Sequence, residues 1–259
     1  MKRLEHLFFN KDKAVLNIYF TAGYPTLDST IEIMKGIQDG GADIIEVGMP
    51  YSDPLADGPV IQESSGIALQ NGMTIDHLFG QLKNFRDTIS IPVVLMGYMN
   101  PVLQYGFEKF CQKAVEVGID GFILPDLPMY EFDNKYHAIL KAYGLDFIFL
   151  VTPETSEDRV RQLDQHSSGF LYAVSSSSTT GNENDFEKVV AYLTRLKTYG
   201  LNNPYLVGFG IKDKATFEKV KPFANGAIIG SAFIKALSST KQPGETAKQF
   251  VASVLNEQA

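Results

Sequence analysis

The sequence predicts an α/β protein, specifically a (β/α)8 TIM barrel with one extra helix at its N-terminus. Short apolar runs alternate with amphipathic stretches along the whole chain, and eight strand–helix units fit within its 259 residues, the usual length of such a barrel. Several of the runs are apolar throughout, as strands that are buried on both faces require. No linker or shift in composition divides the chain, so residues 1–259 are expected to form a single barrel domain.

The expected strands are short runs rich in apolar and β-branched residues. They cover residues 16–20, 43–47, 92–96, 121–124, 146–151, 169–174, 205–208 and 227–229. The expected helices cover residues 60–69, 75–86, 107–117, 130–143, 186–199 and 245–255, with further helices starting near Asp28, Ser156, Asp213 and Ala232. Asp28 and Ser156 are expected to be N-caps, because their side chains can accept bonds from the free N–H groups of a first helical turn. The alternative is an open doubly wound sheet, but no G-x-G-x-x-G motif opens the first helix.

Composition and charge exclude several classes of function. The net charge is −7, and no cluster of Lys and Arg interleaves with aromatic residues, so nucleic-acid binding is not expected. The single Cys111 cannot form an internal disulfide, which suits a reducing compartment. No signal peptide or membrane span is recognisable, and a cytoplasmic location is therefore expected.

The most informative stretch covers residues 46–59, EVGMPYSDPLADGP. Glu46 lies near the carboxyl end of an expected buried strand, where a charged side chain needs an explanation. The loop that follows contains Asp53 and Asp57 and three prolines, which fix φ, so the loop is expected to be rigid. A carboxylate at a strand end and another in a rigid loop form an arrangement that can present an acid/base pair to a substrate.

Each candidate side chain also has a purely structural interpretation. Glu46 could be a core carboxylate bonded to backbone amides, although burial also raises the pKa as a general acid near neutral pH requires. Asp57 could cap the following helix, and Asp53 and Asp126, each next to a proline, could be turn residues. Tyr172 lies within an expected strand, where its hydroxyl could simply satisfy a buried neighbour.

Glycines at the ends of the last two expected strands predict an anion site. Residues 208–211, GFGI, end the seventh strand, and residues 225–232, NGAIIGSA, lead the eighth strand into a helix. Glycine lets backbone N–H groups approach an anion, and these two loops are the usual phosphate site of such barrels. Gly181, in the loop after strand six, could close the cradle. The alternative is that these glycines only form tight turns.

Other catalytic groups are missing from the expected strand ends. The histidines lie in the N-terminal segment or in expected helices, at His6, His77, His137 and His166. No lysine lies at a strand end, so a Schiff-base mechanism lacks its nucleophile, and no group of side chains has the spacing of metal ligands. Carboxylates and phenols remain, and neither a metal nor a cofactor is expected.

Residues 45–59, IEVGMPYSDPLADGP, closely resemble the signature of the tryptophan synthase alpha chain family. Further segments resemble that family in the same order, at residues 20–25, 95–98, 100–101, 125–128, 208–211 and 230–232. The resemblance implies a barrel that cleaves indole-3-glycerol phosphate to indole and glyceraldehyde 3-phosphate. It also implies a partner, the pyridoxal-phosphate-dependent beta chain, which would receive the indole within an α2β2 heterotetramer.

The resemblance further implies roles for particular residues. Glu46 matches the catalytic glutamate, Asp57 matches an aspartate that bonds the indole nitrogen, and Tyr172 matches a tyrosine near the reacting carbon. The loop after strand six departs from the family pattern at Ser178 and Thr179, where the family usually has Gly and Val. Phosphate contacts are implied at Gly181, Gly210, Gly230 and Ser231, and a lid contact to Asp57 is implied at Thr180. Indole contacts are expected from Tyr19 and Phe209. Partner contacts are expected from Pro50, Asp53 and residues 98–105 and 128–131.

Three alternative functions stay open at this point. Another phosphate-binding barrel, such as a sugar-phosphate isomerase or epimerase, would use the same glycines and a carboxylate base, but it leaves the Asp57 loop unexplained. A non-catalytic regulatory subunit that binds a phosphate ligand would not need Glu46. A stand-alone lyase that releases indole without a beta chain would share every motif.

Overall fold

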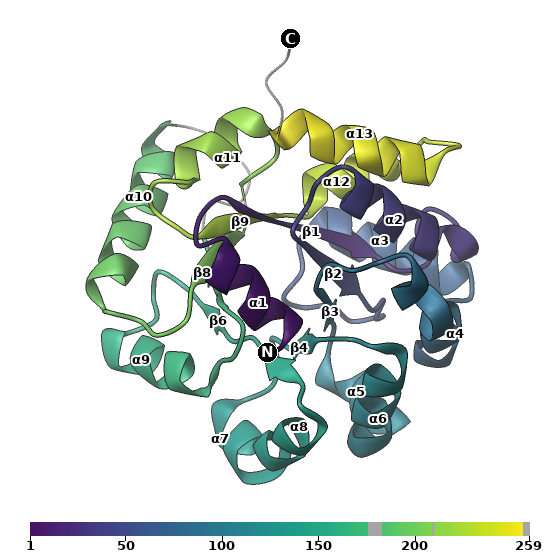
Figure 1. Ribbon diagram of the computed structural model, residues 1–259, viewed down its shortest axis with the longest axis horizontal. Coiled ribbons are helices and arrows are strands. Elements are labelled where there is room, and N and C mark those ends of the chain that lie inside the picture. Colours follow the sequence, from purple (N-terminus) through teal and green to yellow (C-terminus); the bar gives the residue numbers. More distant parts are fainter. Residues whose placement is uncertain (176–182, 209, 256–259) are drawn as a thin grey trace.

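The computed structural model describes residues 1–175, 183–208 and 210–255 (Figure 1). Three predicted site residues, Thr180, Gly181 and Phe209, lie outside these ranges, as do Ser178 and Thr179. The described strands form one parallel sheet in the order β5-β4-β3-β2-β1-β9-β8-β7-β6. Their bounds are β1 Val15–Thr21, β2 Ile44–Gly48, β3 Val93–Met96, β4 Gly121–Ile123, β5 Asp146–Phe147, β6 Leu150–Val151, β7 Leu171–Val174, β8 Tyr205–Gly208 and β9 Gly226–Ile229.

The two ends of this sheet, β5 and β6, belong to one continuous stretch of chain, residues 146–151. Its first half pairs with β4, where the Ile148 N–H donates to the carbonyl oxygen of Phe122 at 3.0 Å. Its second half pairs with β7, where the Tyr172 N–H donates to the carbonyl oxygen of Phe149 at 2.9 Å. The predicted fifth strand is therefore divided in two, and it closes the sheet into the predicted barrel.

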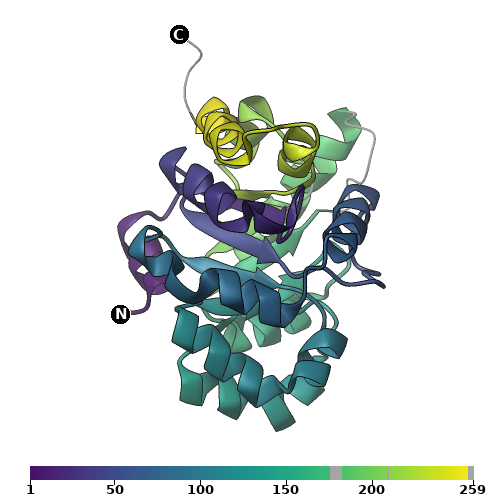
Figure 2. The same cartoon turned by 90° about the vertical axis from the view of Figure 1, so that its right-hand side faces the viewer.

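Helices surround the barrel, as Figures 1 and 2 show. Their bounds are α1 Arg3–Asn10, α2 Thr30–Asp39, α3 Pro59–Gln70, α4 Ile75–Gln81, α5 Met99–Tyr105, α6 Phe107–Val117, α7 Met129–Glu131, α8 His137–Tyr143, α9 Glu157–His166, α10 Glu183–Thr198, α11 Lys214–Val220, α12 Ser231–Leu237 and α13 Pro243–Leu255. Short turns of other helix types adjoin them, at η1 Leu27–Ser29, η2 Leu82–Asp87 and the π-helix η3 Phe132–Tyr136. No helix in the described ranges is long and apolar enough to cross a membrane.

Local capping explains where the helix predictions succeed and fail. Ser156 is the N-cap of α9, and its hydroxyl accepts a bond from the Arg159 N–H at 3.4 Å, as predicted. Asp28 is not an N-cap, because it lies inside the 3-10 turn η1 and α2 begins after Ser29. Helix α5 was not predicted. The Asp126 carboxylate, which comes from the loop after β4, accepts the Met99 N–H at 3.0 Å and so caps α5 from a distant part of the chain.

Helix α1, the predicted extra helix, crosses the end of the barrel where the strands begin (Figure 1). Its Leu4 is fully buried. Ion pairs hold the same helix to the strand starts, since Lys2 Nζ lies 2.7 Å from Asp146 and Arg3 lies 3.0 Å from Asp120. Figure 2 shows α1 on one side of the barrel and α3 on the opposite side. Because α1 covers the end where the strands begin, the opposite end, where the strands finish and α3 lies, is the end available for a functional site.

We expect Leu4→Ala to lower the free energy of unfolding by about 2–5 kcal/mol, because it removes a fully buried side chain and leaves a cavity. Urea denaturation followed by circular dichroism measures the change. Phe9→Ala, in the same helix but 78% exposed, is the matched control and should change stability by less than about 0.5 kcal/mol. Equal losses for the two variants would show that Leu4 does not anchor α1.

Candidate active site

Glu46 lies in β2 with its side chain fully buried inside the barrel. Asn17, from the neighbouring strand β1, donates from Nδ2 to Glu46 Oε2 at 2.7 Å. The other carboxyl oxygen, Oε1, has no hydrogen-bond partner within the described part of the chain. Burial raises the pKa of Glu46 to about 8, although the Asn17 bond lowers it, and the nearby Asp57 carboxylate adds to the increase. Glu46 is therefore mostly protonated at neutral pH.

Asp57 is held by an aromatic side chain rather than by the next helix. The Tyr98 hydroxyl donates to Asp57 Oδ2 at 3.0 Å and accepts the Ala56 N–H at the same distance, so it clamps the acidic loop at two points. Burial raises the pKa of Asp57 to about 6, and the Tyr98 bond opposes this increase. The residue at the N-cap of α3 is Gly58, so the capping interpretation of Asp57 is wrong.

Tyr19 and Tyr172 lie in β1 and β7, each almost fully buried. Burial is the main cause that raises the pKa of both hydroxyls, and the charges of Glu46 and Asp57 raise it further. Glycines make room for both hydroxyls. A Cβ atom on Gly48 would lie 2.2 Å from the Tyr19 hydroxyl, and one on Gly208 would lie 2.4 Å from the Tyr172 hydroxyl. These contacts require glycine at both strand ends, and they bring the two phenols beside the carboxyl groups.

The described residues of the predicted anion site follow two neighbouring strands, β8 and β9. Gly210 has φ +77°, a conformation that favours glycine, and Gly230 is the N-cap of α12. The first intrahelical bond there runs from the Ile234 N–H to the Gly230 carbonyl at 2.9 Å. The N–H groups of the first helical turn, which Ser231 begins, therefore have no acceptor inside the helix. Ser231 is exposed, so this turn is accessible.

Other predicted candidates lie away from the buried carboxyl groups. Asp126 caps α5 and is structural. Asp53 is exposed and accepts a bond from the hydroxyl of Ser52, and Pro50 is half-buried at the start of the same loop. Cys111 is buried in α6, and burial raises the pKa of its thiol to about 12, which makes it an inert core residue. No group of three or more metal-ligating side chains was found within the described ranges.

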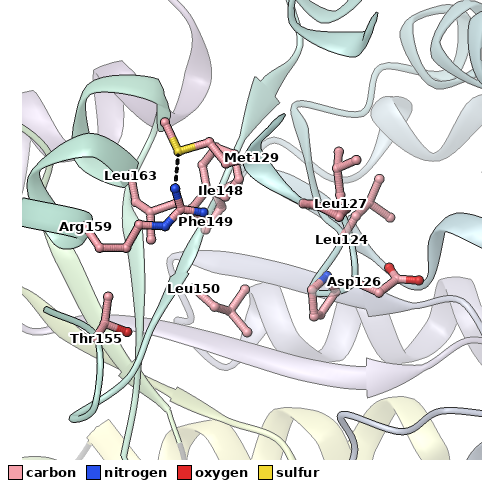
Figure 3. A pocket seen from close by; sticks show the side chains of 12 residues that line it. Leu124, Asp126, Leu127, Met129, Ile148, Phe149, Leu150, Thr155, Arg159 and Leu163 are labelled. Carbon is pink, nitrogen blue, oxygen red and sulfur yellow. Dashed lines mark hydrogen bonds between the residues drawn. The ribbon is translucent and has the colours of Figure 1, made fainter. Parts of the chain in front are cut away.

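A cavity of about 370 Å³ lies between the ends of β4 and β6 and the helix α9 (Figure 3). Its walls include Leu124, Ile148 and Leu150, and Figure 3 shows the Arg159 side chain pointing toward the sulfur of Met129, to which it donates a bond. Neither of the two buried carboxyl groups lines this cavity. Leu150 pairs with Tyr172 in the sheet, so the cavity is adjacent to the candidate site.

Two side chains at the site were given no role in catalysis or substrate binding from the sequence. In the sequence, Asn17 is a single polar residue within an apolar strand, and nothing in the pattern predicts a role for it. Its contact with Glu46 becomes visible only when β1 packs beside β2. Tyr98 lies 41 positions from Asp57 in the chain, and only its place in a motif shared with the family could have signalled a role.

A closed parallel barrel with two protonatable carboxyl groups, one in a strand and one in the loop that follows it, is the structure of a barrel enzyme equipped for acid/base chemistry. A sequence model described as "Tryptophan synthase alpha chain" matches residues 7–258. The chain belongs to the tryptophan synthase alpha chain family. It is accordingly a carbon–carbon lyase that cleaves indole-3-glycerol phosphate to indole and glyceraldehyde 3-phosphate, the reaction that the family resemblance implied.

Individual relatives agree over nearly the full length. The tryptophan synthase alpha chain of Parabacteroides distasonis is 50% identical over 252 residues, which cover 97% of this chain and 98% of the relative. That of Flavobacterium johnsoniae is 52% identical, over 89% of this chain and 91% of the relative. Among solved structures, tryptophan synthase subunit alpha from Legionella pneumophila superposes with a TM-score of 0.89 at 35% identity, covering 98% of this chain and 97% of that one.

We expect Glu46→Gln to stabilise the protein relative to wild type, increasingly so between about pH 5 and pH 8. The folded wild type binds the Glu46 proton more tightly (pKa about 8) than the unfolded chain does (ordinary value 4.5), so its stability falls as the pH rises through this window. Glutamine does not titrate, so the stability of the variant does not fall with pH for this reason. The difference should grow by at most about 1.4 kcal/mol for each pH unit.

Urea denaturation at several pH values measures this difference. The control is Glu187→Gln, which changes an exposed side chain of α10 and should leave the pH dependence of stability as in wild type. A constant difference between Glu46→Gln and wild type across the window would mean that Glu46 is ionised in the folded protein.

Proposed function

We propose that Glu46 is the acid and base of the retro-aldol cleavage, within a single catalytic domain formed by residues 1–259. The observation that carries this proposal is the buried carboxyl group of Glu46, which burial keeps protonated near neutral pH and which has one oxygen, Oε1, without a partner among the described residues. Such a group can deliver a proton at neutral pH and take one back.

The cleavage needs a destination for the electrons of the breaking bond, and the indole ring provides it. Glu46 would protonate the ring carbon C3, which leaves an electron-poor, iminium-like ring. The bond between C3 and the glycerol side chain then breaks, and its electron pair restores the aromatic ring. The hydroxyl on the adjacent side-chain carbon loses its proton to Glu46 and becomes the aldehyde of glyceraldehyde 3-phosphate. One proton is given and one is taken, so Glu46 ends as it began.

Asp57 would stabilise the positive charge that develops on the ring. Its pKa of about 6 leaves it mostly ionised at pH 7, while Glu46 stays mostly protonated, so the two carboxyl groups can take opposite roles. An anion that faces the ring N–H is worth roughly 3 kcal/mol in the transition state, or about two powers of ten in rate. Tyr172 would lie near the reacting carbon, and Tyr19 would face the indole.

The phosphate of the substrate would bind at the glycine-rich ends of β8 and β9. The N–H groups at the start of α12, which have no acceptor inside the helix, and the left-handed turn at Gly210 support this placement. Binding there would orient the reacting carbon through contacts remote from it. We assign this role to Gly210, Gly230 and Ser231, together with Gly181, and we assign the lid contact to Thr180 and a further indole contact to Phe209.

We propose that the chain works with a tryptophan synthase beta chain. Solved structures titled tryptophan synthase, including one from Mycobacterium tuberculosis with a TM-score of 0.86 at 30% identity, resemble this chain. An α2β2 heterotetramer that passes indole to the beta chain is the expected assembly in the cytoplasm. Pyridoxal phosphate would belong to the partner, and the alpha chain would need no cofactor of its own. A stand-alone lyase is the alternative, and size-exclusion chromatography with the beta chain separates the two.

We expect Glu46→Gln to lower the release of indole from indole-3-glycerol phosphate by several powers of ten, measured with the beta chain present. Glutamine keeps the shape of glutamate but cannot exchange the proton. Substrate should still bind, so the loss should appear in kcat with little change in KM. Wild-type kcat/KM should be greatest between about pH 6 and pH 8, because Asp57 must be ionised and Glu46 protonated.

Glu187→Gln is the control for this experiment, because its side chain is exposed on α10, and it should keep the wild-type rate. A Glu46→Gln enzyme that keeps most of its activity would make Glu46 a structural residue and the proposed mechanism wrong. Inactive wild type in the presence of the beta chain would contradict the function itself.

We expect Asp53→Ala to weaken binding to the beta chain roughly tenfold while leaving phosphate binding unchanged. Asp53 and Pro50 lie in the loop that follows β2, and the neighbouring Leu55 is 92% exposed, so this loop offers an accessible surface. Titration of the beta chain measures the first quantity, and titration with glyceraldehyde 3-phosphate measures the second. Asp12→Ala, an exposed aspartate near the starts of the strands, is the control. Equal losses in both titrations for Asp53→Ala would reject the assignment.

A further inference from the structure

Asn17 is a fully buried polar residue in the middle of β1, among side chains that are otherwise mostly apolar. Its Nδ2 atom donates a hydrogen bond to Oε2 of Glu46, the proposed acid, at 2.7 Å. A buried amide is costly unless it is bonded, so this contact accounts for the presence of a polar side chain at this depth.

The bond makes the two carboxyl oxygens of Glu46 different. Oε2 accepts the Asn17 N–H, whereas Oε1 has no partner among the residues that the structure describes. A protonated carboxyl group has one carbonyl oxygen, which accepts, and one hydroxyl oxygen, which carries the proton. An N–H donor that faces Oε2 favours the carbonyl form at that oxygen. The proton is then placed on Oε1.

We propose that Asn17 is a positioning residue, which holds Glu46 so that its acidic proton sits on Oε1, the oxygen left available to the substrate. This inference rests on the proposed role of Glu46. The same bond serves the second half of the reaction, because an N–H donor also stabilises the carboxylate that forms when the proton leaves. Asn17 thus supports both protonation states without a change of its own charge.

The other groups around Glu46 cannot take this role. Asp57, from the loop after β2, is an anion that opposes ionisation of Glu46. Tyr19 and Tyr172, from β1 and β7, lie near enough for the charge of an ionised Glu46 to raise the pKa of both hydroxyls. No hydrogen bond between Glu46 and either tyrosine is present in the described structure. Of these groups, Asn17 is the one that donates a hydrogen bond to Glu46 in the described structure. Its own Oδ1 has no partner among the described residues, so the bond to Glu46 is the contact that orients the amide.

Asn17→Leu tests the proposal, because leucine has a similar size and cannot donate. We expect kcat for indole release, with the beta chain present, to fall roughly 10- to 100-fold, the usual effect of losing a bond to a charged group. KM should change by less than about threefold. The alkaline limb of the kcat/KM profile should move to higher pH, because the bond that stabilises the carboxylate is gone. Asn17→Ser, whose hydroxyl can donate, should recover part of the rate and move the limb back.

Two further measurements keep the test decisive if Asn17→Leu is poorly folded. Titration of 13C-labelled glutamate side chains by NMR, with Glu46→Gln to assign the signal, follows Glu46 directly in each variant. Ile18→Val, a conservative change at a neighbouring buried position of β1, should leave the limb where it is in wild type. A lower rate for Asn17→Leu with an unchanged Glu46 titration would overturn the proposal and leave Asn17 a packing residue. An unchanged rate would also overturn it.

The inference and the proposed function can fail separately. If Glu46→Gln is inactive while Asn17→Leu keeps the wild-type rate and pH profile, Asn17 has no positioning role and the role of Glu46 stands. If Glu46→Gln keeps most of the wild-type rate, Glu46 is not the acid, and the positioning role of Asn17 in catalysis falls with it.

Discussion

Burial of the Glu46 carboxyl group is the constraint on which the rest of the site depends. An acid in contact with water would be ionised at neutral pH and unable to donate a proton, whereas inside the barrel its pKa is raised to about 8. The barrel must therefore stay closed around it. The divided strand at residues 146–151 completes the sheet, and helix α1, whose Leu4 is buried, covers the end opposite the candidate site.

The same enclosed space also holds two phenol side chains, and their size requires glycine at two neighbouring positions. The hydroxyls of Tyr19 and Tyr172 occupy positions that a Cβ atom on Gly48 or Gly208 would obstruct. Glycine at a strand end is thus used for close packing as well as for turns. Removing water from around these groups strengthens every electrostatic interaction among them, which is how Asp57 influences Glu46 without a direct hydrogen bond.

The fold was predictable because each strand is a short apolar run and each such run forms a strand within about two residues of its expected bounds. What the sequence could not show are contacts between distant segments. Helix α5 depends on a cap from Asp126, and the loop of Asp57 depends on the Tyr98 hydroxyl. The proposed acid, Glu46, was visible because a charge in an apolar strand is conspicuous. Asn17 was not, because a neutral amide there has no pattern of its own.

Stability and chemistry make opposite demands on position 46. A buried carboxyl group with a raised pKa weakens the folded state as the pH rises, and an amide or an apolar side chain of similar size would not. A purely structural residue would be free of that cost, so the retention of an acid here is better explained by proton transfer than by packing. Asn17 offsets part of the cost by bonding Oε2, and Oε1 keeps no partner among the described residues, which is the arrangement that a proton donor needs and a core residue does not.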